Sequence, residues 1–129
     1  MKDVTCGIIH YEDKFLISQR SRIKQEYALF WELPGGKRDE GETIEDCMKR
    51  ELHEELSIDV KFTGVVYEKK GFINKYDLYY CDCICLTDIK DIKHNEEIEK
   101  FAIVSKEELL NYNFILGDKE ILRHYLSKI

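Results

Sequence analysis

The stretch GKRDEGETIEDCMKRELHEELSI, residues 36–58, contains the clearest local structural signals in the chain. Its first part, residues 37–42, is polar and includes a glycine, which is typical of a loop. Thr43 is a good N-cap residue, and an Asp three positions further on gives a weaker form of the capping box. We therefore expect a helix over about residues 44–56.

The apolar face of this helix contains carboxylates at positions where hydrophobic side chains are expected. At 100° per residue, the face is formed by Ile44, Cys47, Met48 and Leu52. Glu51 and Glu55 fall within this sector, and Glu54 lies on its flank. Two carboxylates ~5 Å apart repel by about 3 kcal/mol at an effective dielectric constant of ~20, and one Arg50 cannot neutralise three of them. A solvated charged face is the ordinary explanation of a Glu-rich helix. The functional explanation is a set of oxygen ligands for Mg²⁺ or Mn²⁺ rather than zinc.

Length and charge argue against several other classes of protein. The 129 residues suit one domain, which we place at residues 1–129. The 26 Asp and Glu exceed the 20 Lys and Arg, and the net charge of −6 argues against a nucleic-acid polymer as partner. No apolar run approaches the ~20 residues of a membrane-spanning helix. Five cysteines without a CxxC pair indicate a reduced, cytoplasmic protein.

The other segments combine strands and short helices without the strict alternation of a doubly wound parallel sheet. Strands are expected at residues 4–10, 15–20, 60–67, 78–86 and 101–104, with a short extended piece at 31–33. A capped helical turn is expected after Ser105, and a terminal helix over residues 119–126. This order predicts an α/β (α+β) fold in which a mixed β-sheet packs between helices.

Residues 36–58 resemble the Nudix box, Gly-x5-Glu-x7-Arg-Glu-U-x-Glu-Glu-x-Gly-U, in which U is an apolar residue. The matching residues are Gly36, Glu42, Arg50, Glu51, Leu52, Glu54, Glu55 and Ile58. Residues 31–37, WELPGGK, resemble the lead-in of MutT-type members. The resemblance implies the Nudix fold, an α/β/α sandwich with a mixed β-sheet. The motif's last Gly is Ser57 here, and a side chain at such a left-handed helix end costs on the order of 1 kcal/mol.

The resemblance also implies a divalent-cation site beside a diphosphate. The implied ligands of Mg²⁺ or Mn²⁺ are the carboxylates of Glu51, Glu54 and Glu55 and the carbonyl oxygen of Gly35. Arg50 would orient Glu51 through a charge-assisted hydrogen bond. Glu42 would either support the metal ligands without binding the metal or hold a water-bridged metal. The general base would be a glutamate of the box or of a later loop. In that loop we favour Glu96 over Glu97 as a further ligand or base.

Contacts to a substrate are implied on both sides of the box. They fall on Arg20, Gly36, Lys37, Phe72, Lys75 and Asp118. Structural alternatives are a surface arginine after a strand for Arg20 and a core aromatic for Phe72. Residues 116–118, Leu-Gly-Asp, resemble the segment with which the family reads the base edge, although Asp118 is also a suitable N-cap of the terminal helix. An Asp at this place is compatible with cytosine, adenine or oxidised guanine.

The expected activity is the Mg²⁺-dependent hydrolysis of a nucleoside triphosphate to the monophosphate and pyrophosphate by a MutT-like monomer or homodimer. The favoured substrates are 8-oxo-dGTP and CTP or dCTP. An alternative in the same class is the hydrolysis of ADP-ribose or of a dinucleoside polyphosphate. A nucleotide-sensing domain that has lost the reaction belongs to a different class. The complete carboxylate set favours the enzyme, because this set decays when catalysis is abandoned.

Overall fold

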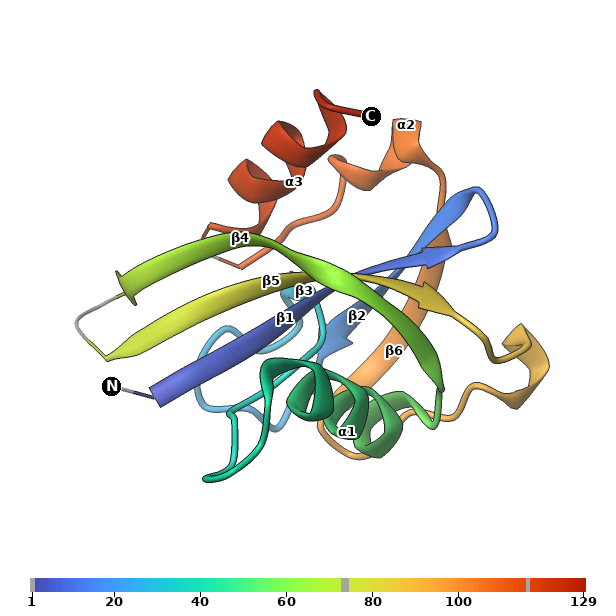
Figure 1. Cartoon of the computed structure of the whole chain (residues 1–129). Coiled ribbons are helices and arrows are strands. Elements are labelled where there is room, and N and C mark those ends of the chain that lie inside the picture. Colours follow the sequence, from blue (N-terminus) through green and yellow to red (C-terminus); the bar gives the residue numbers. More distant parts are fainter. Residues whose placement is uncertain (1, 73–74, 116) are drawn as a thin grey trace.

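The centre of the molecule is a mixed β-sheet, which has six strands in the described part of the chain (Figure 1). The structure, a computed structural model, describes residues 2–72, 75–115 and 117–129. The strands are β1 (Lys2–Tyr11), β2 (Lys14–Arg20), β3 (Trp31–Glu32), β4 (Val60–Phe72), β5 (Tyr76–Cys85) and β6 (Ile98–Val104). The helices are α1 (Ile44–Leu56), α2 (Lys106–Leu109) and α3 (Asp118–Leu126), with a 3-10 turn η1 at Ile89–Asp91.

Strand β1 lies in the middle of the sheet and has neighbours of both directions. The strand order is β3-β2-β1-β5-β4, and β6 pairs with β2. β1 and β2, which contain the first two predicted strands, form an antiparallel hairpin. β1 and β5 are parallel, with Lys2 opposite Tyr76 and His10 opposite Ile84. This parallel pair makes the sheet mixed, which confirms the prediction.

Helices cover both faces of the sheet, with α1 on one side and α2 and α3 on the other (Figure 1). Because neighbouring strand residues point to opposite faces, the core consists of two clusters. Ile8 and Ile17 pack with Leu109, Leu122 and Tyr125 of α2 and α3. Ile9 and Leu16 pack with Met48, Leu52 and Leu56 of α1. The expected α/β/α sandwich is confirmed.

Helix α1 begins and ends at the predicted residues. The Thr43 hydroxyl accepts a hydrogen bond from the Asp46 N–H at 3.0 Å, as an N-cap does. At the other end Ser57 is left-handed, with φ 59° and ψ 34°, and its N–H donates to the His53 carbonyl at 3.0 Å. Its hydroxyl donates to the Lys93 carbonyl at 3.1 Å. Ser57 thus adopts the conformation of the motif's glycine and gains one side-chain bond.

Several element ends differ from the sequence prediction; β6, for example, begins at Ile98, three residues before its predicted start. Strand β4 continues to Phe72, five residues beyond the predicted end, because it stays paired with β5 as far as Tyr76. Helix α3 has Gly117 as its N-cap, and Asp118 is its first residue. The interpretation of Asp118 as an N-cap is therefore wrong. Among the described residues, no helix combines the length and the apolar character needed to cross a membrane.

Candidate active site

The loop after β3 lies along β1 and places two glycines beside the carboxylates of α1. The Thr5 N–H donates to the Gly36 carbonyl at 2.8 Å, and the Gly7 N–H donates to the Pro34 carbonyl at 2.7 Å. Within the described residues, no N–H of β1 donates to the Gly35 carbonyl between them. A Cβ on Gly35 would overlap the Thr5 carbonyl, and a Cβ on Gly36 would overlap the Glu51 carboxylate. Glycine is needed at Gly35 because the clash there is with backbone, whereas a side chain at Gly36 would force the Glu51 carboxylate to move.

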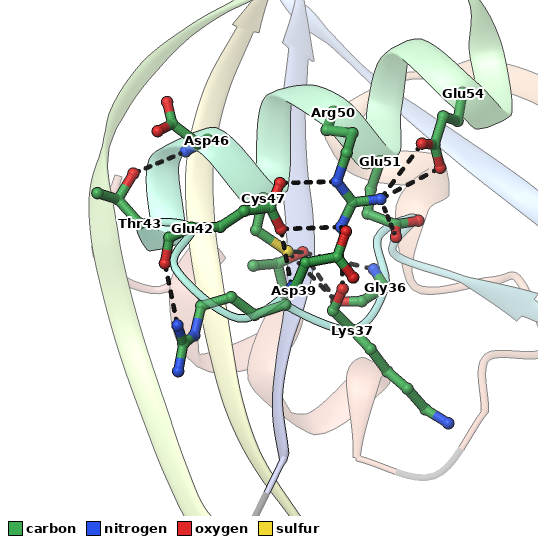
Figure 2. A network of polar contacts seen from close by, with 12 residues as sticks. Gly36, Lys37, Asp39, Glu42, Thr43, Asp46, Cys47, Arg50, Glu51 and Glu54 are labelled. Atoms are coloured by element: carbon green, nitrogen blue, oxygen red, sulfur yellow. Dashed lines mark hydrogen bonds and ion pairs between the residues drawn. The ribbon is translucent and has the colours of Figure 1, made fainter.

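Arg50 is the centre of the polar network on α1 (Figure 2). Its guanidinium donates to both oxygens of Glu42, at 2.7 and 3.0 Å. It also donates to Glu51 Oε1 at 3.0 Å and to Glu54 at 3.3 Å. Hydrogen bonds from Arg50, and then one from a backbone N–H, lower the pKa of Glu42 to about 2. Arg50 therefore holds Glu51 in the expected way, and Glu42 in turn holds Arg50.

Glu55 is a buried carboxylate to which no described residue donates a hydrogen bond. It is 8% exposed. Burial, followed by the charges of Glu32, Glu51 and Glu97, raises its pKa to about 9. Burial also raises the pKa of Glu51, although the hydrogen bond from Arg50 opposes this effect. A carboxylate in such surroundings requires a proton or a cation.

A cavity of about 610 Å³ brings most of the predicted site residues together. This volume lies in the usual range of small-molecule sites. The predicted residues that line the cavity are Arg20, Gly35, Gly36, Lys37, Glu51, Glu55, Phe72 and Asp118. Glu42, Arg50 and Glu54 form the network on α1 and do not line it. Lys75 lines an adjoining hollow of about 520 Å³ together with Glu26, Tyr27 and Tyr76.

The later loop presents Glu97, not Glu96, to the cavity. Glu96 is exposed and does not line the cavity, whereas Glu97 does. The chain turns at Asn95, whose side-chain oxygen accepts from the Glu97 N–H at 2.9 Å, and the Glu97 carboxylate lies 2.7 Å from the Lys24 ammonium. The preference for Glu96 therefore does not agree with the geometry, since a loop of this kind has no periodicity from which side-chain directions follow.

Sequence reasoning did not single out Lys24 or Glu32, although both line the cavity. Lys24 lies in the loop after β2, which carries no recognisable motif. For Glu32 a signal was available: Trp31 is in the core, so the next residue of β3 points to the opposite face. The Glu32 carboxylate accepts from Arg20 Nη1 at 3.1 Å. Burial nevertheless raises its pKa.

The cavity is also lined by Asp118, which is 3% exposed. Its Oδ2 accepts from the Leu33 N–H at 3.1 Å, and its Oδ1 accepts from the Tyr80 hydroxyl at 3.4 Å. Burial raises the pKa of Asp118 to about 7. Phe72 lies at the same cavity, with the Lys69 ammonium 4.8 Å from its ring centroid. Of the predicted segment 116–118, residue 116 lies outside the described residues.

The carboxylates have the chemistry of a site for a hard divalent cation, but they are not gathered around one point. Within the described ranges, no three His, Cys, Asp or Glu side chains are close enough together to hold a metal ion. Arg50 contributes to this arrangement because it binds both Glu51 and Glu54. The buried Glu55 carboxylate and the carbonyl oxygen of Gly35, both at the cavity, are oxygen ligands of the kind that Mg²⁺ and Mn²⁺ prefer. By its chemistry, the donor set therefore fits such an ion.

The chain is similar to known proteins over nearly its whole length. Residues 1–125 match the NUDIX domain family. The nucleoside triphosphatase NudI of Escherichia coli O81 (strain ED1a) is 26% identical over 133 residues, which cover 95% of this chain and 94% of the relative. A MutT structure from a study of Aliivibrio salmonicida and Vibrio cholerae has a TM-score of 0.78 at 25% identity and covers 99% of this chain and 98% of its own. An ADP-ribose pyrophosphatase from Streptococcus suis has a TM-score of 0.78 at 26% identity, covering 98% of this chain and 90% of its own.

Proposed function

This chain belongs to the NUDIX domain family, and on that basis we propose that it is a Mg²⁺- or Mn²⁺-dependent hydrolase that cleaves a nucleoside triphosphate to the monophosphate and pyrophosphate. The observation that carries the proposal is one cavity that is lined both by Glu51 and Glu55 of α1, which we call its carboxylate end, and by the buried Asp118 of α3. Such a cavity has room for a phosphate chain beside the carboxylates and for a base beside the aspartate. The name of the NudI relative, a nucleoside triphosphatase, supports the same class of substrate.

The carboxylate end is proposed to perform the hydrolysis. The residues that would hold the divalent cation are Glu51, Glu54, Glu55 and, through its carbonyl oxygen, Gly35. The bound ion would neutralise phosphate charge and lower the pKa of the attacking water. Arg50, which does not itself line the cavity, would hold Glu51 in position through its hydrogen bond. We assign the additional carboxylate to Glu97 in place of Glu96, because Glu97 lines the cavity and lies within electrostatic reach of Glu51 and Glu55.

Asp118 is proposed to recognise the edge of the base. With a pKa of about 7, the side chain exists at neutral pH both as a carboxylate and as a carboxylic acid. It can therefore accept a hydrogen bond from an amino group or donate one to a carbonyl. This versatility supports an oxidised guanine nucleotide such as 8-oxo-dGTP, or CTP or dCTP. Phe72 supplies an apolar ring for stacking at the same end.

The adjoining hollow favours a second candidate, the hydrolysis of ADP-ribose or of a dinucleoside polyphosphate. Tyr27 and Tyr76 line both the cavity and this hollow, so a longer ligand could extend from one to the other. The Lys37 ammonium lies 5.4 Å from the centroid of the Tyr76 ring, and Lys75 adds a second positive charge. A second aromatic group with a phosphate next to it matches these surroundings.

The test is a hydrolysis assay with Mg²⁺ on 8-oxo-dGTP, dGTP, CTP, dCTP, ATP, ADP-ribose and diadenosine polyphosphates. Pyrophosphate, phosphate and nucleotide products are quantified separately, with EDTA as a control. The release of pyrophosphate from one triphosphate is expected. Cleavage confined to ADP-ribose or the dinucleotides would select the second candidate. Tight nucleotide binding without any turnover would select the nucleotide-sensing alternative.

Glu54→Gln tests the metal-binding role within the same assay. Turnover is expected to fall about 100-fold or more, because one oxygen ligand loses its charge. The matched control is Glu45→Gln, since Glu45 is an exposed residue of the same helix that pairs only with Lys49, at 2.8 Å, among the described residues. A normal rate in Glu54→Gln would remove Glu54 from the proposed mechanism.

A further inference from the structure

The loop between β2 and β3, residues 21–30, is tied down at both ends and carries a lysine into the cavity. The side chains of Gln19 and Arg20 donate to the carbonyls of Leu29 and Glu26, at 3.0 to 3.2 Å. The Ser21 N–H donates to the Glu97 carbonyl at 3.1 Å, and the Lys24 N–H donates to the Ser21 carbonyl at 3.1 Å. These bonds place the backbone of Lys24 beside the carboxylate end of the cavity.

The Lys24 ammonium is the counter-ion of the acidic cavity wall. Its Nζ lies 2.7 Å from Oε2 of Glu97, and the Lys24 side chain is 27% exposed. Its charge also acts on Glu32 and Glu55, whose pKa values it lowers against the effect of burial. One lysine thus serves three carboxylates, two of which are strongly desolvated.

The family resemblance assigned Arg20 to the substrate, but its guanidinium already donates hydrogen bonds within the protein. Its Nη1 donates to Glu32, and its Nε and Nη2 donate to the Glu26 carbonyl. Lys24 has a single recorded acceptor among the described residues, Glu97, although an ammonium group has three N–H donors. Of these two cations, Lys24 therefore has the greater capacity to bind an additional anion.

We propose that Lys24 is an exchangeable counter-ion that neutralises the carboxylate end of the free cavity and moves to the phosphate chain when a metal-bound triphosphate enters. This inference rests on the proposed function, since it assigns a phosphate ligand within the same site. Lys24 and a divalent cation act on the same carboxylates, so each lowers the affinity of the other. The incoming phosphate chain carries several negative charges and offers Lys24 a stronger partner than Glu97.

The two halves of the exchange predict effects of opposite sign for Lys24→Met. Without the competing charge, the free protein is expected to bind Mn²⁺ more tightly, by up to about tenfold. Without the phosphate ligand, it is expected to bind inorganic triphosphate in saturating Mg²⁺ about tenfold more weakly. Both affinities can be measured by titration calorimetry. Inorganic triphosphate contains no base, so the result does not depend on which nucleotide is the substrate.

Arg22→Gln is the matched control, because Arg22 ties the same loop to Glu99 at 2.7 Å and does not line the cavity. It should leave both affinities unchanged, and Lys24→Arg should restore the binding of triphosphate. The melting temperature of Lys24→Met shows whether the apolar methionine impairs folding. If it does, Lys24→Gln is used for the same two titrations.

The exchange would be overturned if Lys24→Met bound both Mn²⁺ and triphosphate more weakly, or if neither affinity changed. Equal changes in Arg22→Gln would also overturn it. A wild-type chain that bound no Mn²⁺ would overturn the proposed function as well. Normal wild-type binding with an unaltered Lys24→Met would overturn only the role of Lys24.

Discussion

Replacement of Asp118 by Asn tests how far the fold controls the protonation of the residue proposed to read the base. The pKa of Asp118 is raised from 3.8 to about 7, chiefly by burial, while the hydrogen bond from the Leu33 N–H opposes this change. Asn has the same shape, so its carbonyl can accept from the Leu33 N–H and its amide can face the Tyr80 hydroxyl. The substitution removes the titration and leaves the packing in place.

The expected effect on stability follows from the direction of the pKa shift. The folded state favours the protonated form of Asp118. Its contribution to the free energy of unfolding is therefore fully present below pH 4 and is lost as the pH rises from about 4 to 7. A difference of about 3 units between the two pKa values corresponds to on the order of 4 kcal/mol. Since Asp118 is 3% exposed, solvent screening does not reduce this figure much. Asn does not titrate, so the variant keeps its stability over the same range.

The assay is urea unfolding of both proteins from pH 4 to pH 8. The free energy of unfolding of the wild type minus that of Asp118→Asn should fall by on the order of 4 kcal/mol across this range. Asp13→Asn, in the exposed turn between β1 and β2, controls for the loss of one negative charge. Parallel curves for the wild type and Asp118→Asn would refute the argument, because they would mean that Asp118 is ionised in the folded protein throughout.

Two further predictions concern the Nudix box. Gly36→Ala should lower kcat by about 100-fold with an unchanged melting temperature, since the new Cβ would displace the Glu51 carboxylate; near-normal turnover would mean that the position of this carboxylate is not critical. Ser57→Gly should raise the free energy of unfolding by about 0.5–1 kcal/mol, measured by urea unfolding, because φ at this position is 59°. A lower value would instead show that the hydroxyl bond to the Lys93 carbonyl outweighs the backbone strain.

Local signals in the sequence account for what was predicted well. Helix α1 runs from Ile44 to Leu56 as expected, because a cap, an apolar period and a left-handed end residue all lie within 36–58. The hairpin of β1 and β2 follows in the same way from two apolar runs and a short polar turn. The mixed sheet was predicted from the order of the elements, although no local signal specifies that β1 pairs with β5.

The features that sequence reasoning missed depend on contacts between distant segments. Asp118 was expected at the substrate, but its burial and its hydrogen bonds from Leu33 and Tyr80, which are far away in sequence, could not be predicted. Lys24 and Glu97 lie in loops that meet only in the folded protein. Lys75 was expected at the substrate on the basis of resemblance, yet it lines the adjoining hollow. In each case the residue type indicated a possible role, but the sequence did not show which way the side chain points in the folded protein.

The parallel pairing of β1 with β5 has a consequence for how the site is assembled. Lys2 lies opposite Tyr76, so the two strands join parts of the chain that are 74 positions apart (76 − 2). Such non-local pairs form late, because a long loop must close before any contact compensates its entropy. The glycine loop binds to β1, and β1 is completed only when β5 docks beside it. During synthesis, the cavity therefore cannot be complete until β5 has emerged and Asp118, near the end of the sequence, has followed it. In refolding, the recovery of activity should report the closure of the sheet.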